Sequence, residues 1–282
     1  VKHIVPLSDI QPGGPPQDGI PSIDDPKFVS IDEANNEIDD NGLGISVSFN
    51  NENRFYPNQI LVWHEIVNDT VGGIPVLITY CPLCGTGVVF SPMVNGKQTE
   101  FGTSGNLWNS NLVMYDRQTK SYWSQILGTS IVGEQAGNKL ELIQYQNLTY
   151  ADWKKEYPDG KVLSIDTGFF RDYNDDPYSS YYSDASIIFP VDHTDERYHP
   201  KSFGYGIEIN DQFKVYPQEE LNKSVGSFND DFAGTTLHIA YNKDTQTLVI
   251  RDMETGEVIV PVFGFWFSWI SVHPETEVHT LQ

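Results

Sequence analysis

Basic residues are scarce in this chain. Its 282 residues include 17 lysines and arginines against 39 aspartates and glutamates, which gives a formal net charge of −22 at pH 7. A protein of this charge repels nucleic acids and anionic membranes, and it attracts cations or basic partners. The composition therefore argues against nucleic acid as a partner and is typical of an acidic, well-solvated surface.

Long hydrophobic runs and the common catalytic motifs are absent as well. No apolar segment approaches the ~18 residues of a membrane-spanning helix, so no membrane span is predicted. The sequence contains no nucleophile elbow, phosphate loop or dinucleotide fingerprint, which leaves the common hydrolase, nucleotide-binding and nicotinamide-dependent classes without support. With 39% hydrophobic residues, a chain of this length can still bury a sizeable core.

Cysteine is rare, and both cysteines belong to one motif. Cys81 and Cys84 lie in LITYCPLCGTGVVF, where a short turn separates two segments rich in β-branched and aromatic residues. Three interpretations compete for this motif: a redox dithiol, half of a metal site, or a small structural disulfide. A thioredoxin-like dithiol is disfavoured, because that fold places its first thiol at a helix N-terminus and GTGVVF is a poor helix former.

We favour the metal interpretation. Cys-Pro-x-Cys-Gly between two strands resembles the knuckle of rubredoxins and zinc ribbons, which aims two thiolates at one ion. The sequence has one such knuckle, and His64 in VWHEIVND is the best candidate for a further ligand, although a lone histidine on a half-apolar helix is often a packed core residue. Thiolate and imidazole suit copper or zinc, with copper slightly favoured by the Irving–Williams order. We therefore expect a metal site formed by Cys81, Cys84 and His64.

An internal repeat is the clearest feature of the organisation. The segment GISVSFNNENRFYPNQIL (44–61) resembles GIEINDQFKVYPQEEL (206–221), and each predicts two strands that end in Tyr-Pro before a short helix. The match continues from 68–90 to 229–250, where asparagine and threonine replace the two cysteines. Because the second copy makes the same turn without thiols, a purely structural role for the cysteines is weakened.

These patterns predict a predominantly β protein of the α+β class, with two tandem copies of a β-rich unit that carries short helices. The expected divisions are an extended N-terminal arm (1–43), a first repeat that holds both cysteines (44–129), an irregular acidic connecting region (130–203) and a second repeat without cysteines (204–282). The connecting region includes a short helix in TYADWKKEYPDG and a tyrosine-rich polar loop in RDYNDDPYSSYYSD.

Four segments carry a family resemblance: YPNQILVWHEIVNDTVGGIPVLITYCPLCGTGVVF, NSNLVMYDRQTKSYWSQ, RDYNDDPY and FWFSWISVHPETEVH. Together they resemble the uncharacterised prokaryotic family catalogued as domain of unknown function 3179, over nearly the whole chain. Members of that family often look exported, which implies an extracytoplasmic or secreted protein with Val1 close to a processed terminus. The resemblance also implies a set of recurrent motif residues: Trp63, His64, Glu65, Asn68, Cys81, Cys84, Gly85, Tyr115, Asp116, Trp123, Gln125, Arg171 and Asp172.

The sequence thus favours an extracytoplasmic metal-binding protein and indicates no particular protein partner. One alternative is an enzyme, either a thiol–disulfide or a metal-dependent oxidoreductase, in which Glu65, Asp116 or Arg171 handles the substrate. The other alternative is a structural or adhesive surface module, in which the cysteines form an inert disulfide.

Overall fold

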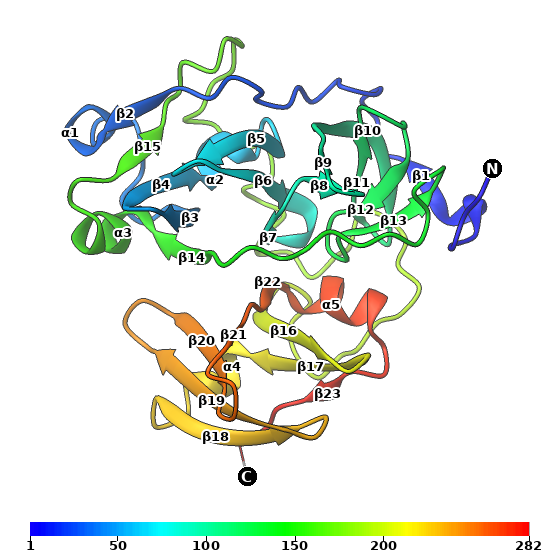
Figure 1. The fold of residues 1–282 in the computed structure, drawn as a ribbon, viewed down its shortest axis with the longest axis vertical. Coiled ribbons are helices and arrows are strands. Elements are labelled where there is room, and N and C mark those ends of the chain that lie inside the picture. The colour runs from blue at the N-terminus through cyan, green and yellow to red at the C-terminus, as the bar shows by residue number, and fades with distance from the viewer. Residues whose placement is uncertain (282) are drawn as a thin grey trace.

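The protein is predominantly β with short helices, as the sequence predicts. The structure, a computed structural model, describes residues 1–281, and position 282 at the end of the predicted second repeat lies outside the described residues. Figure 1 shows β1–β15 in its upper part and β16–β23 in its lower part. The helices are α1 (Ile31–Ala34), α2 (Asn58–Leu61), α3 (Tyr150–Glu156), α4 (Gln218–Leu221) and α5 (Trp266–Val272), with 3-10 turns η1 (Leu7–Asp9) and η2 (Pro82–Cys84). None of the helices in residues 1–281 is long and apolar enough to cross a membrane.

Two five-stranded sheets make up much of the upper part. The first has the order β14-β3-β4-β15-β2 and the second the order β1-β10-β11-β12-β13. Neighbouring strands run antiparallel except β15, which joins β4 in parallel. The strands are β1 (Ile10–Pro12), β2 (Phe28–Ser30), β3 (Leu43–Phe49), β4 (Glu52–Pro57), β10 (Phe101–Trp108), β11 (Asn111–Asp116), β12 (Tyr122–Ser124), β13 (Thr129–Val132), β14 (Gln146–Thr149) and β15 (Lys161–Leu163), with a small separate hairpin of β8 (Met93–Val94) and β9 (Lys97–Gln98).

A seven-stranded sheet links the two parts. Its order is β23-β17-β16-β22-β7-β6-β5, and β22 meets β7 where Phe263 pairs with Gly87. A four-stranded sheet, β18-β19-β20-β21, completes the lower part. The strands are β5 (Ile66–Val71), β6 (Ile74–Cys81), β7 (Thr86–Phe90), β16 (Phe203–Ile209), β17 (Gln212–Pro217), β18 (Ser227–Phe232), β19 (Thr235–Asn242), β20 (Thr247–Asp252), β21 (Val258–Ile259), β22 (Val262–Phe265) and β23 (Glu277–Val278).

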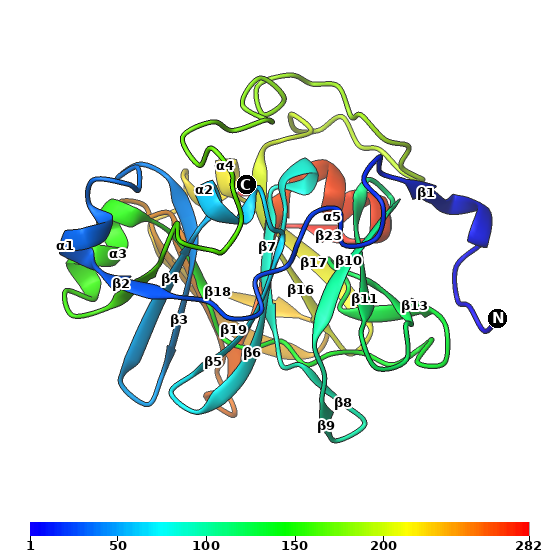
Figure 2. The same cartoon turned by 90° about the horizontal axis from the view of Figure 1, so that it is seen from above.

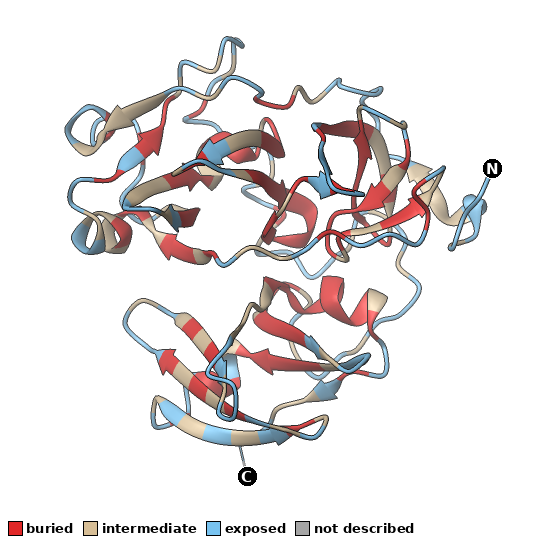
Figure 3. Ribbon diagram, viewed as in Figure 1, coloured by how far each residue is buried: buried red, intermediate tan, exposed pale blue. Residues whose placement is uncertain are grey.

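Buried aromatic side chains hold helices and sheets together. Phe55 on β4 packs between two aromatic residues of α3, with ring centroids 5.6 Å from Tyr150 and 5.1 Å from Trp153. All three rings are fully buried, and Figure 3 shows that burial is concentrated in the strands while the connecting loops are exposed. Every residue of β7 is buried, and so is every residue of β6 after its first two. Both strands lie where the two parts of the molecule meet. The turn between β6 and β7 is therefore an interior feature.

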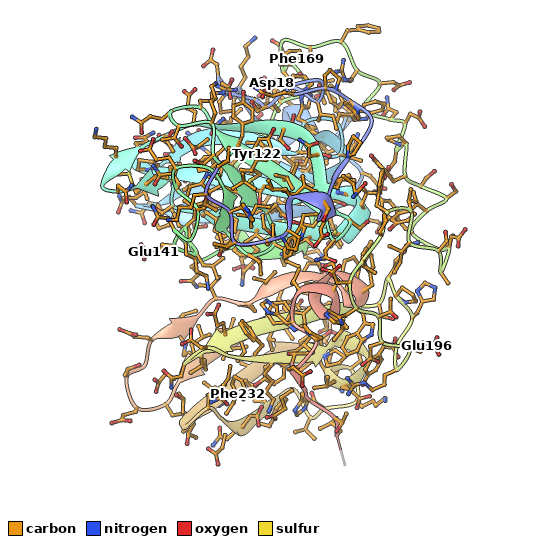
Figure 4. The ribbon with its side chains drawn as sticks, turned by 90° about the vertical axis from the view of Figure 1, so that its right-hand side faces the viewer. Asp18, Tyr122, Glu141, Phe169, Glu196 and Phe232 are labelled. Atoms are coloured by element: carbon orange, nitrogen blue, oxygen red, sulfur yellow. The ribbon has the colours of Figure 1, made fainter. Side chains whose placement is uncertain are left out.

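The predicted connecting region does not consist of irregular chain alone. It contains β14, α3 and β15, and these strands join the sheet of β3 and β4. Only its second half, residues 164–202, has neither strand nor α-helix, and we call this segment the strap. Figure 2 shows the strap arching over the molecule, and in Figure 4 it follows the outer edge from near Phe169 to near Glu196. It connects the upper and lower parts.

Lys201 anchors the strap. Its buried ammonium group donates hydrogen bonds to the carbonyl oxygens of Tyr181 at 2.6 Å and Ser186 at 2.8 Å, and to the carbonyl oxygen of Asp184. The same nitrogen lies 3.5 Å from the centroid of the Tyr181 ring. Three charge-assisted hydrogen bonds and a cation–π contact satisfy an ammonium group that burial alone would destabilise. One side chain thus fixes three points of a segment without secondary structure.

Replacing this anchor tests its role. We expect Lys201→Met to lower the free energy of unfolding by about 2–3 kcal/mol, because three carbonyl groups lose a charged donor. Chymotrypsin should then cleave the strap faster at its tyrosines, which limited proteolysis with mass spectrometry would detect. Lys97→Met, at an exposed position, is the matched control. Equal cleavage of the Lys201 and Lys97 variants would contradict the anchoring role.

Candidate functional site

The two cysteines lie in a 3-10 turn, η2, between β6 and β7. Pro82 takes the first position of this turn, where its missing N–H leaves no hydrogen bond unmade, and Gly85 ends it with a φ of +55°. A Cβ atom at Gly85 would lie 2.7 Å from the ring of Phe265. The left-handed backbone and the close approach both require glycine here. Cys81 and Cys84 are buried by this arrangement, and both are free thiols.

The β10–β11 hairpin packs against the thiols. The Cys84 thiol donates to the carbonyl oxygen of Ser110 at 3.3 Å, and Ser110 lies in the tight turn between these strands with a φ of +60°. The Cys81 thiol interacts with the Cys84 thiol and with the backbone of Leu112. Burial raises the pKa of the Cys81 thiol, and the adjacent Cys84 raises it further. Cys81 is therefore held as a neutral thiol at neutral pH.

Three tyrosines of the strap cover the turn. The hydroxyl of Tyr181 donates to the carbonyl oxygen of Leu83, inside the turn, at 2.9 Å. Burial raises the pKa of Tyr178 to about 12, with smaller contributions from Glu65 and Cys81. Tyr182 meets Phe265 edge-on with ring centroids 6.2 Å apart. The anchored strap thus encloses the thiols beneath aromatic side chains.

Glu65 is the acidic group of this cluster. The residue is largely buried, with 7% of its surface exposed. Burial, followed by the neighbouring Cys81, raises the pKa of this carboxyl well above its ordinary value. Its backbone has a φ of +60°, and its carbonyl accepts from the amide of Tyr80 at 2.7 Å. A largely buried carboxyl group with a raised pKa on strained backbone is a combination found at functional sites.

His64 is turned away from the thiols. Its Nδ1 lies 2.8 Å from the carbonyl oxygen of Pro21, and its Nε2 lies 2.7 Å from the hydroxyl of Tyr173. A carbonyl oxygen can only accept, so Nδ1 carries the proton and Nε2 accepts from the tyrosine hydroxyl. Burial lowers the pKa of His64 to about 4. Both ring nitrogens of this neutral imidazole are therefore occupied.

The predicted metal site is wrong. No group of three or more His, Cys, Asp or Glu side chains within residues 1–281 is placed to hold a metal ion. Cys81 and Cys84 do lie together, but His64 has no nitrogen available to join them. The predicted copper or zinc ligand set is thus not formed. The alternative with an inert disulfide also differs from the structure, in which both cysteines are free.

The two other acid–base candidates lie apart from this cluster. Asp116 is buried at the end of β11, where it accepts from the indole N–H of Trp123 at 2.9 Å and from the Thr119 hydroxyl. These bonds brace its own hairpin. Arg171 donates to the carbonyl oxygen of Phe170 at 2.8 Å, and its charge acts on His64. The structure thus brings together Cys81, Cys84 and Glu65.

A cavity of about 660 Å³ opens beside the turn. Tyr80 and Gly85, which flank the cysteine turn on either side, form part of its wall. The strap contributes Asp176 and Tyr182, and β22 contributes Phe265. Further lining comes from the segment between α1 and β3, the starts of α2 and β3, and Phe203 of β16. The volume is within the range of small-molecule sites, and the cysteine turn joins two of its wall residues, Tyr80 and Gly85.

Comparison with protein families identifies the chain. A family model described as "Protein of unknown function (DUF3179)" matches residues 17–276. The chain belongs to this family. No curated protein and no solved structure matches it. The matched range of this DUF3179 protein includes the cysteine turn, Glu65 and the strap, so every part of the site lies within the family's domain.

Several residues of the site in the DUF3179 protein were not predicted from the sequence. The strap was recognised as tyrosine-rich, but nothing in its composition indicated that it covers the cysteines. The cavity residues Asn58, Lys201 and Phe265 are far apart in the chain, and nothing in the sequence indicates that they line one cavity. The sequence also does not reveal that Lys201 binds three backbone carbonyl groups of the strap.

The protonation of Glu65 can be tested through stability. Between the ordinary carboxyl pKa of 4.5 and the raised pKa in the folded state, the folded protein keeps a proton that the unfolded chain has lost. Wild-type stability should therefore fall as pH rises, by up to about 1.4 kcal/mol per pH unit from this group. Glu65→Gln removes the effect. In urea unfolding, the free energy of unfolding of the variant relative to wild type should therefore increase from pH 4 to pH 7. Parallel stability curves would contradict the buried neutral carboxyl.

The structural role of His64 gives a second test. We expect His64→Ala to lower the free energy of unfolding by about 2–4 kcal/mol, because it leaves the Pro21 carbonyl and the Tyr173 hydroxyl without their partner. His193→Ala, at an exposed histidine, should change stability by less than about 0.5 kcal/mol in the same denaturation experiment. Similar effects of the two substitutions would refute the role assigned to His64.

Proposed function

We propose that this protein binds a small organic molecule in the cavity beside the cysteine turn. The carrying observation is the cavity itself, whose walls come from the strap, β22 and the residues that flank the dithiol. Phe203, Phe263 and Phe265 provide aromatic surface, and neighbouring amide and carboxyl side chains provide polar contacts. Apolar walls with a few polar groups are typical of small-molecule sites.

The charges of the lining favour a neutral or cationic ligand. Glu37, Asp39 and Asp176 line the cavity, and Lys201 is the basic residue among the lining residues. The ammonium of Lys201 is already taken up by three backbone carbonyls. With a net charge of −22 on the whole chain, an anionic ligand meets an unfavourable potential on approach and in the site.

Asn58 supports a ligand that donates a hydrogen bond. This residue lines the cavity at the first position of α2, and its side-chain oxygen is buried without a partner among the described residues. A buried acceptor without a partner costs about 1–3 kcal/mol, so a ligand N–H or O–H that reaches it recovers that cost. A flat aromatic amine or amide combines this donor with the stacking surface that the phenylalanines offer.

We also propose that the chain arose by duplication of one unit. Tyr56 donates to Asp69 at 2.6 Å in the first half, and Tyr216 donates to Asp230 at 2.7 Å in the second. The orders β3-β4-α2-β5-β6-β7 and β16-β17-α4-β18-β19-β20 correspond. The elements β14-α3-β15 then correspond to β22-α5-β23, since each last strand joins its sheet in parallel. In this scheme the first unit contains β8–β13 as an insertion.

The cellular setting remains part of the proposal. An extracytoplasmic or secreted location is supported by the similarity to a family whose members often look exported. The acidic surface suits such a setting, because a high net charge keeps a protein soluble and monomeric. Fractionation of the source cells with an antibody to the chain would test the location directly.

Binding can be tested with a charge-balanced library of aromatic amines, amides and carboxylic acids, screened by thermal shift. We expect stabilisation by amines or amides and none by the acids. For a compound that binds, Asn58→Leu should weaken affinity about tenfold by titration calorimetry, because the donor loses its acceptor, while the unliganded protein keeps its stability. Asn41→Leu, at an exposed position outside the lining, is the control. Preferential binding of the acids, or no binding in any class, would refute the proposal.

A further inference from the structure

We propose that Cys81 and Cys84 are a redox-active dithiol that reduces small neutral or cationic disulfides, with Glu65 as the group that transfers the proton. The proposed route of the substrate through the cavity rests on the proposed function above. The dithiol chemistry itself rests on separate observations: the state of the two thiols, the backbone at Glu65, and the parts of the fold that surround them.

The two thiols are arranged so that they can close into a disulfide. They are separated by two residues in one turn, interact with each other, and are not bridged. The corresponding turn in the second half is built differently: the side-chain oxygen of Asn242 accepts from the amides of Asp244 at 2.9 Å and Thr245 at 3.3 Å. The fold thus makes this turn without sulfur. The cysteines are not required to form it, and a chemical role accounts for their presence.

Glu65 occupies a position where the scaffold favours glycine. In the second half, Gly226 has a φ of +98°, and its carbonyl accepts from the amide of Tyr241 at 2.6 Å. In the first half, Glu65 has a φ of +60°, and its carbonyl accepts from the amide of Tyr80 at 2.7 Å. A non-glycine residue in this region is strained by roughly 1–2 kcal/mol. The side chain that this strain accommodates is a largely buried carboxyl, and Cys81 directly follows its backbone partner Tyr80.

Two parts of the surroundings of the dithiol have no counterpart in the second half. The insertion β8–β13 supplies the Ser110 carbonyl that accepts from Cys84, and the strap supplies Tyr181, which donates to the carbonyl of Leu83. The turn between β10 and β11 is tied to the strap, because Asn109 donates to Asp192 at 3.0 Å and accepts from its amide at 2.7 Å. Two segments absent from the second half thus meet around the thiols. They build an enclosed site with the cavity as its neighbour.

The reaction balances without a further reagent. Cys81 sulfur attacks one sulfur of the substrate disulfide, so that a mixed disulfide forms and the substrate S–S bond breaks. Glu65, as a neutral carboxyl, donates its proton to the leaving sulfur and takes up the Cys81 proton in the same step. Cys84 sulfur then attacks Cys81 sulfur, which closes the Cys81–Cys84 disulfide and releases the second product, with the Cys84 proton, as a thiol. One disulfide is reduced by two electrons, two thiols leave, and the protein dithiol is oxidised.

The test compares three disulfides of similar size: cystamine (cationic), bis(2-hydroxyethyl) disulfide (neutral) and dithiodiglycolate (anionic). The reduced full chain is mixed with each disulfide, quenched by alkylation, and weighed by mass spectrometry. Each rate is divided by the rate for the same chain unfolded in denaturant, which removes the intrinsic reactivity of the reagent. We expect the Cys81–Cys84 disulfide to form with cystamine and the neutral compound, about tenfold or more faster in this normalised measure than with the anion.

Variants assign the roles. Cys84→Ser should trap the mixed disulfide on Cys81, whereas Cys81→Ser should trap none. Glu65→Gln should slow closure about 100-fold, the usual contribution of a positioned acid–base group. Glu65→Gly introduces the residue that the second half has at this position. It should slow closure to a similar extent and relieve the backbone strain. Glu141→Gln, at an exposed glutamate outside the site, should leave the rate unchanged.

The outcomes separate the two proposals. If the folded protein stays reduced with all three disulfides, or if neither Glu65 variant differs from wild type, the redox proposal is refuted. If all three disulfides react at equal normalised rates and Glu65 still matters, the dithiol chemistry stands and the charge-selective cavity falls. Selective reaction with the cationic and neutral compounds, lost in the Glu65 variants, supports both.

Discussion

The site depends on the ammonium group of Lys201. The strap has no sheet or helix to hold it, so its position over the cysteine turn relies on side-chain contacts, and this buried cation supplies three of them. With the strap in place, Tyr181 reaches the carbonyl of Leu83 and Tyr182 meets Phe265. The cavity, the enclosure of the thiols and the raised pKa values of Cys81 and Glu65 all follow from that coverage.

Enclosure changes the chemistry of the cysteine turn. An exposed Cys-x-x-Cys pair exchanges freely with solvent thiols and metal ions, whereas an enclosed pair reacts only with molecules that can enter its site. Here the β10–β11 hairpin and the strap close over the pair from separate parts of the chain. Glu65 is buried with the pair as a neutral carboxyl, so a group that can relay the proton of the thiol chemistry lies inside the site. The left-handed backbone at Glu65 favours glycine, so the carboxyl side chain, and not the backbone conformation, accounts for glutamate at this position.

The sequence predicted local features well, because they depend on neighbouring residues. The β-rich class, the strands on either side of the CPLC turn and the end of that turn at Gly85 follow from β-branched residues, proline and glycine. The family resemblance was also confirmed, since it rests on long motifs. The proximity of Cys81 and Glu65 could also have been predicted from the sequence. Cys81 ends β6, Glu65 directly precedes β5, and these two strands pair.

The errors arose where distant segments decide the outcome. His64 has the right chemistry for a metal ligand, but Pro21 and Tyr173 occupy its nitrogens from positions 43 and 109 residues away. No local pattern reveals such partners. The coverage of the turn by the strap is of the same kind. The most direct test is the alkylation rate of Cys81 and Cys84 in the folded protein by a polyethylene-glycol maleimide, a reagent too large to enter the cavity. We predict a rate at least about 100-fold below that of the unfolded chain, restored in part by Lys201→Met; equal rates in folded and unfolded protein would show that the thiols are not enclosed.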